Sequence, residues 1–111
     1  MATNAVLHHN TPVTTAQGLF HELDVYPNRF VIRRTDLLSR LFGSEEIIAY
    51  DDIKEMHIHE ERFLNNHRVQ FIIVTHHSNV RSLSYEASQE RLIQHIKETV
   101  EEFLDHRAAN V

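Results

Sequence analysis

The sequence predicts an α+β domain that is mainly β, with antiparallel strands joined by short turns and one long helix after them. Two patterns lead to this prediction. Between residues 18 and 85, turn residues divide the chain into short segments in which apolar and polar side chains alternate, as expected for half-buried strands. Residues 87–106 then carry apolar side chains at helical spacing. With 111 residues, the chain has the length of one domain.

Residues 1–17 are rich in Thr, Asn, Ala and His and lack a sustained period, which predicts a flexible N-terminal arm. The domain is expected to comprise residues 18–107, followed by a short tail at 108–111. Residues 18–25 alternate and residues 30–34 run back, and the Tyr-Pro-Asn-Arg sequence between them is typical of a tight turn. These two segments therefore predict a hairpin.

The segment 35–44 allows two interpretations. Four large apolar residues in it have the spacing of one helical turn: Leu37, Leu38, Leu41 and Phe42. The segment is also short enough to be a loop that packs the same side chains under the sheet. Large apolar residues in a connection either join the core or form an exposed patch for a neighbouring subunit. They are therefore candidates for an interaction surface.

Further strands separated by turns are predicted in the second half of the domain, at residues 47–50, 53–60, 68–75 and 80–84. Residues 68–75 carry apolar side chains on both faces, which indicates a central strand. The segments near Ile47 and at 81–85 are expected at sheet edges, where an incoming chain can add a strand. The apolar stripe of the helix is expected to pack in the core.

Composition excludes several classes of protein. The chain has no cysteine, which excludes disulfides and thiolate sites and fits a reducing compartment, so a cytoplasmic location is expected. A net charge of −5 argues against a dedicated nucleic-acid-binding protein. The longest apolar run, residues 71–74, is far too short to span a membrane, and residues 1–17 lack the features of a signal peptide.

A family resemblance follows from the order of these segments. It is carried by residues 23–32 (LDVYPNRFVI), by Phe42-Gly43, by residues 47–53 (IIAYDDI), and by the final hairpin and helix. From about Gly18 to Leu104 the chain resembles the pleckstrin-homology-like superfamily, in particular the small bacterial PH domains and the related GRAM type. The resemblance implies a bent antiparallel β-barrel of six to seven strands capped by one C-terminal helix. It also implies a binding or scaffolding module without catalytic chemistry.

Histidine is unusually frequent, with ten residues in the chain. His57 and His59 are two apart on a predicted strand, so both side chains leave the same face. Imidazoles at this spacing are candidate zinc ligands, with Glu55 or Glu61 as a third ligand. The alternative is that both occupy a solvated face. Taken together, the histidines also predict a surface charge that responds to pH between about 5 and 7.

One stretch of the chain is locally basic. It contains Arg29, Arg33, Arg34 and Arg40, with Asp36 as its single acid. In the lipid-binding PH domains that the chain resembles, basic residues around the first hairpin hold the phosphates of inositol headgroups. The four arginines are therefore candidates for binding an anionic lipid. Arg33 and Arg34 are adjacent and point to opposite faces of a strand, so the alternative is that the arginines pair with acidic residues of the domain.

An enzyme is not expected. Acidic and imidazole side chains cluster between residues 51 and 61, but the chain lacks a nucleophile elbow, a Gly-rich phosphate loop and an HExxH motif. The expected function is a non-enzymatic module that acts through a protein partner or through self-association as a homo-oligomer. Peripheral binding to anionic phospholipid headgroups is the alternative, and histidine-based metal binding ranks third. Neither a cofactor nor a nucleic-acid partner is expected.

Overall fold

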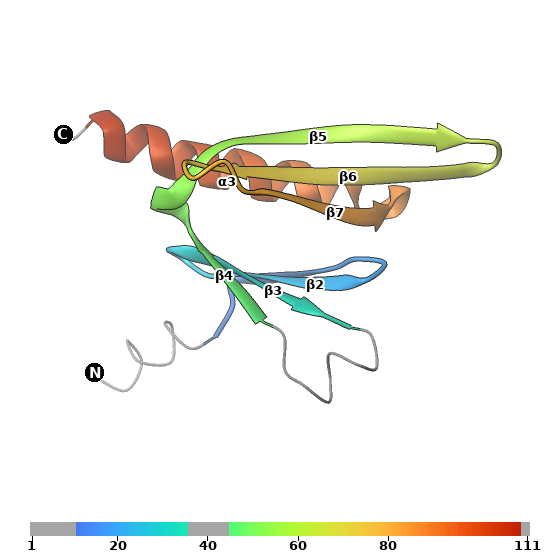
Figure 1. Ribbon diagram of the computed structural model, residues 1–111, viewed down its shortest axis with the longest axis horizontal. Coiled ribbons are helices and arrows are strands. Elements are labelled where there is room, and N and C mark those ends of the chain that lie inside the picture. The colour runs from blue at the N-terminus through green and yellow to red at the C-terminus, as the bar shows by residue number, and fades with distance from the viewer. Residues whose placement is uncertain (1–10, 36–44, 110–111) are drawn as a thin grey trace.

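The computed structural model describes residues 11–35 and 45–109 of the chain. This part contains antiparallel strands followed by one long C-terminal helix (Figure 1), which confirms the mainly β, α+β prediction. The elements in order are β1 (Thr14–Gln17), β2 (His21–Val25), β3 (Arg29–Arg34), β4 (Glu45–Ala49), the 3₁₀ helix η1 (Tyr50–Asp52), β5 (Ile53–Phe63), β6 (Asn66–Thr75), β7 (Val80–Glu86), the 3₁₀ helix η2 (Ala87–Gln89) and α3 (Glu90–Ala109).

The described strands form two antiparallel sheets, which Figure 1 shows as two layers. The first has the order β1-β2-β3-β4 and the second the order β5-β6-β7. A backbone hydrogen bond connects the layers: the amide of Leu19, between β1 and β2, donates to the carbonyl of Ser84 on β7 (2.9 Å). The amide of His76 donates to the carbonyl of Asp52 (2.8 Å), which continues the β5–β6 ladder past the pair of Ile53 and Thr75.

The first sheet begins earlier than the sequence predicts. Residues 14–17 were expected in the flexible arm, but they form β1, which pairs with β2 so that Ala16 lies opposite Leu23. Ala16 is fully buried. The strand is short, polar and buries one small side chain, so its stability comes from pairing with β2 rather than from a local pattern. Residues 1–10 of the predicted arm lie outside the described part.

The alternation predicted for the long hairpin is confirmed. Met56 on β5 and its partner Ile73 on β6 are buried, whereas His57 and His59 on the other face of β5 are exposed. β6 is the middle strand of its sheet, as its apolar residues on both faces predicted. The reversal between β5 and β6 lies at residues 64–65, one position earlier than the predicted pair of asparagines.

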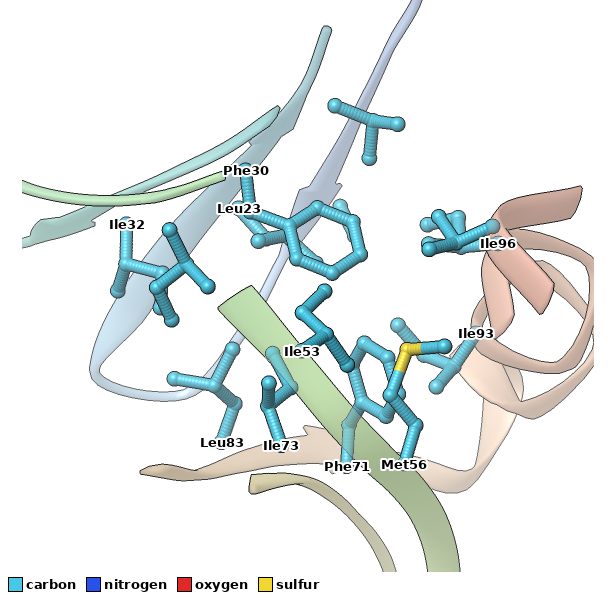
Figure 2. Packing of buried hydrophobic residues seen from close by; sticks show 14 of the residues in the cluster. Leu23, Phe30, Ile32, Ile53, Met56, Phe71, Ile73, Leu83, Ile93 and Ile96 are labelled. Atoms are coloured by element: carbon cyan, nitrogen blue, oxygen red, sulfur yellow. The ribbon is translucent and has the colours of Figure 1, made fainter. Parts of the chain in front are cut away.

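One hydrophobic core is shared by both sheets and α3. Figure 2 shows side chains of the two sheets and of the helix pointing into the same space. Phe30 on β3 is fully buried at its centre, and its ring lies edge-on to the rings of Tyr50 (5.0 Å between centroids) and Phe71 (6.0 Å). Aromatic pairs of this geometry add to the free energy gained from burial alone. The core therefore fixes α3 against both sheets.

The C-terminal helix confirms the predicted stripe. Ile93, Ile96 and Val100 are buried, and Phe103 stacks edge-on against Tyr50 at 5.6 Å between centroids. The helix α3 itself begins at Glu90, after the 3₁₀ turn η2, and so starts three residues later than the predicted helix. None of the described helices is long and apolar enough to cross a membrane.

Candidate functional site

A depression runs between β5 and α3 in the described part of the chain. β5 is the outer strand of its sheet and α3 runs alongside it (Figure 1). Two adjacent cavities, of about 640 and 460 Å³, follow this line and share Met56 in their walls. We call this feature the β5–α3 groove; it is defined by Ile53, Met56 and Ile58 of β5 and by Gln94, Glu101 and Leu104 of α3.

The floor of the β5–α3 groove is apolar. Ile53 and Met56 belong to the buried core, and Ile58 and Leu104 are partly buried against it. Met56 and Ile58 are two residues apart, so their side chains share one face of β5. This face packs toward α3. A partner side chain that entered the groove would therefore meet apolar surface.

The rim of the larger cavity is mostly acidic. Asp51, Glu101 and Asp105 contribute carboxylates to it, against two cationic side chains, Lys54 and Arg107. Arg107 forms an ion pair with Asp51. Lys97 donates to both carboxylate oxygens of Glu101 (3.1 Å). Over both cavities, the carboxylates of Asp51, Glu98, Glu101 and Asp105 exceed the cationic groups of Lys54, Lys97 and Arg107 by one charge, which favours a cationic partner.

The arginines predicted to bind lipid do not form one cluster in the described part. Arg29 lies at the β2–β3 turn, where its guanidinium is 4.1 Å from the ring centre of Tyr26 and its Nη1 donates to Oδ1 of Asn28 (2.9 Å). Arg33 and Arg34 leave β3 on opposite faces, as predicted. Arg40 lies outside the described residues.

Arg33 is held by acidic side chains of the neighbouring strand. Its Nη2 donates to Oδ2 of Asp24 (2.6 Å) and lies 3.5 Å from Oε2 of Glu22. Asp24 is buried, and its other carboxylate oxygen accepts a hydrogen bond from the Thr15 hydroxyl (3.0 Å). A buried carboxylate needs such partners because burial without them is costly. Arg33 therefore stabilises the fold at this point. This agrees with the alternative that the arginines pair with acidic residues; the sequence could not name the partners, because the pairing depends on the strand register.

The strands near Ile47 and Arg81 are sheet edges, as predicted: β4 and β7 are the outer strands of their sheets. Ile47 and Val80 on these strands are exposed. The guanidinium of Arg81 binds both carboxylate oxygens of Glu46 through Nε (2.5 and 2.7 Å), which links the two edges. The second interaction candidate, formed by Leu37, Leu38, Leu41 and Phe42, lies outside the described residues.

The predicted metal ligands His57 and His59 are neighbours on the exposed face of β5. Nε2 of His57 lies 3.4 Å from Oε2 of Glu55. The group of three potential metal ligands that the described residues bring together contains neither histidine. It consists of Glu60, His67 and Glu90. No local sequence pattern indicated this group, because its members come from three different elements.

Two tyrosines, Tyr50 and Tyr85, are buried in the core. The hydroxyl of Tyr50 donates to the backbone carbonyl of Tyr26. Burial raises the pKa of Tyr50 and of Tyr85 above the ordinary value of a phenol. Both side chains are therefore neutral at physiological pH, and their role is structural.

The β5–α3 groove combines an outer strand, an apolar floor and an acidic rim, which suits it to binding an extended cationic segment. Comparison with protein-family models, with curated proteins and with solved structures found no match to the chain.

Proposed function

We propose that the chain is a non-enzymatic interaction module that binds an extended, basic segment of a partner protein in the β5–α3 groove. The observation that carries this proposal is the position of β5. It is an eleven-residue strand, paired with β6 alone among the described residues, and it borders a groove with an apolar floor and an acidic rim.

The partner segment is proposed to pair with β5 as an additional strand. An outer strand has unpaired N–H and C=O groups along its free edge, and an extended peptide can satisfy them. The groove follows β5 from Ile53 to Ile58, a length of roughly 20 Å at the usual rise of a strand. In the bound segment, alternate side chains would point toward Met56 and Leu104, and the others toward solvent and the rim.

Charge supports a basic rather than an acidic segment. Glu101 and Asp105 of α3 lie on the rim with Asp51, and the whole chain carries a net charge of −5. Complementary charges speed association and add specificity more than affinity. Binding is therefore expected to weaken as salt concentration rises.

The proposed architecture is a PH-like bent barrel, and the proposed location is the cytoplasm. A four-stranded and a three-stranded antiparallel sheet that share a core with a C-terminal helix support a PH-like bent barrel. The absence of cysteine supports a cytoplasmic location. No catalytic role is assigned to any residue.

Two alternatives have less support. Self-association would use the outer strands β4 or β7, whose exposed Ile47 and Val80 are small isolated apolar contacts. Binding to anionic lipid would need free arginines, but Arg33 is paired with Asp24, and Arg34 leaves the strand on the opposite face.

The test uses two fluorescent peptides of about nine residues, one alternating Lys with Val and the other alternating Glu with Val. Fluorescence anisotropy at low and physiological salt should show tighter binding of the Lys peptide. Asp105→Lys, on the rim, should weaken this binding by roughly threefold or more, because reversing one partly exposed charge changes the free energy by about 1 kcal/mol.

Glu102→Lys is the matched control. It makes the same change of net charge on the same helix, but Glu102 does not line the groove. Equal weakening by both variants, or equal affinity for both peptides, would contradict the proposal. An oligomer that forms without peptide would favour self-association. Salt-sensitive pelleting with phosphatidylserine vesicles that Arg34→Ala abolishes would favour the lipid alternative.

A further inference from the structure

Three ligand-type side chains meet where the β5–β6 hairpin passes the start of α3. They are Glu60 of β5, His67 of β6 and Glu90, the first residue of α3. One carboxylate oxygen from each glutamate and one imidazole nitrogen all lie within 4.8 Å of one another.

The strand register explains how these residues meet. Glu60 lies opposite Val69 in the β5–β6 ladder, and His67 is two residues from Val69, so Glu60 and His67 are diagonal neighbours on one face. The same face carries Met56 and Ile58, which pack toward α3. The group is thus placed between three elements by the packing of the core, and not by flexible loops.

The imidazole of His67 has an unused nitrogen at this point. Its Nε2 is shielded from solvent and has no hydrogen-bond partner among the described residues. Oε2 of Glu60 lies 3.7 Å from this nitrogen. The distance allows an ion pair but is too long for a hydrogen bond. Burying a polar nitrogen without a hydrogen-bond partner costs free energy. The lone pair of such an imidazole nitrogen can instead bind a metal ion.

The two carboxyl groups are close enough to affect each other. One oxygen of each lies within the 4.8 Å that spans the group. Two carboxylates at this distance repel each other, and a cation bound between them would relieve that repulsion.

We propose that Glu60, His67 and Glu90 form a binding site for a divalent transition metal ion, with Zn²⁺ as the best fit. One imidazole nitrogen and two carboxylate oxygens are a donor set that zinc accepts, with water in the fourth position. Mg²⁺ and Ca²⁺ prefer oxygen ligands alone and fit less well. Ligands of a tetrahedral zinc are about 3.4 Å apart. The 3.7 Å between His67 and Glu60 is already close to this value, and rotation of the glutamate side chains closes the rest.

The bound ion would connect the hairpin to the first turn of α3. Because metal ligands must be deprotonated to bind the ion, binding would weaken at acidic pH. The site lies beyond Ile58, past the end of the β5–α3 groove, and does not depend on a peptide being bound there.

The test is isothermal titration of the full chain, freed of metal with a chelator, with ZnCl₂ at about pH 7.5. We expect one tight site per chain. His67→Gln and Glu90→Gln should each weaken it by about tenfold or more, the scale seen when groups that hold a metal are removed. MgCl₂ should give no comparable heat.

A control is needed because the chain contains ten histidines, which bind zinc weakly wherever they are exposed. The double variant His57→Gln/His59→Gln removes two imidazoles from the opposite face of the same strand and should retain the tight site. Circular dichroism would verify that each variant is folded, and the visible spectrum of bound Co²⁺ gives a second readout. Wild-type zinc affinity in His67→Gln, or loss of the tight site in the His57/His59 variant alone, would overturn the proposal.

Discussion

Two buried tyrosines provide a matched test of the core. Tyr50 and Tyr85 are both almost completely buried, with relative exposures of 3% and 0%. They differ in one respect. The Tyr50 hydroxyl donates to the carbonyl of Tyr26, whereas the Tyr85 hydroxyl has no hydrogen-bond partner in the described part of the chain. Replacing each by phenylalanine removes the hydroxyl and keeps the ring.

The expected effects have opposite signs. Tyr50→Phe loses one hydrogen bond, which costs about 0.5–1.5 kcal/mol and more if the Tyr26 carbonyl is left without a partner. Tyr85→Phe removes a buried hydroxyl that is unpaired, a group that costs about 1–3 kcal/mol to bury. Its free energy of unfolding should therefore stay unchanged or increase. The two variants should therefore differ by at least about 0.5 kcal/mol, with Tyr50→Phe the less stable.

Urea unfolding followed by circular dichroism measures this difference. Both variants should have the m-value of the wild type, so that a shift of the midpoint reports stability directly. If Tyr85→Phe is destabilised as much as Tyr50→Phe, the Tyr85 hydroxyl has a partner and the described packing around it is wrong.

Three further predictions concern other parts of the fold. First, above about pH 10 the unfolded chain loses its phenolic protons before the folded chain does, because burial raises the pKa of Tyr50 and Tyr85, so stability should fall as pH rises. The double phenylalanine variant should lose less stability in alkaline urea titrations, and parallel curves would contradict this. Second, a Cβ at Gly18 would lie 2.8 and 3.0 Å from two backbone oxygens, so Gly18→Ala should lower the free energy of unfolding by roughly 1–3 kcal/mol. An unchanged midpoint would mean that the sheets do not approach closely there. Third, Arg33→Leu should destabilise the chain because it leaves the buried carboxylate of Asp24 without its cation, and adding Asp24→Asn should recover part of the loss. Additive effects in this cycle would contradict the pairing.

Strong local patterns made much of the fold predictable. The hairpin from β5 to β6 alternates over its whole length, and the α3 stripe of Ile93, Ile96 and Val100 has a clear helical period. β1 was missed because its pattern is weak. Its four residues include one buried side chain, Ala16, and the strand exists through pairing with β2. A non-local cause of this kind leaves no local signal.

The candidate sites were predicted less well for the same reason. Pairing of Arg33 with an acidic residue was one of the two interpretations, but nothing local in the sequence identifies Asp24 on the neighbouring strand as the partner. The sequence drew attention to His57 and His59 because they are close in sequence. His67 and Glu90 are 23 positions apart, and only the packing of β6 against α3 brings them together. The β5–α3 groove likewise depends on how two distant elements pack.

The central claim is that β5 receives a partner segment along its free edge. Amide hydrogen exchange of the full chain, with and without the Lys/Val peptide at saturating concentration, tests it most directly. If the peptide pairs with β5, exchange should slow for the outward-facing amides between Ile53 and Ile58 and stay unchanged in β4 and β7. Slower exchange confined to β4 or β7, or no change in β5 while the peptide is bound, would contradict it.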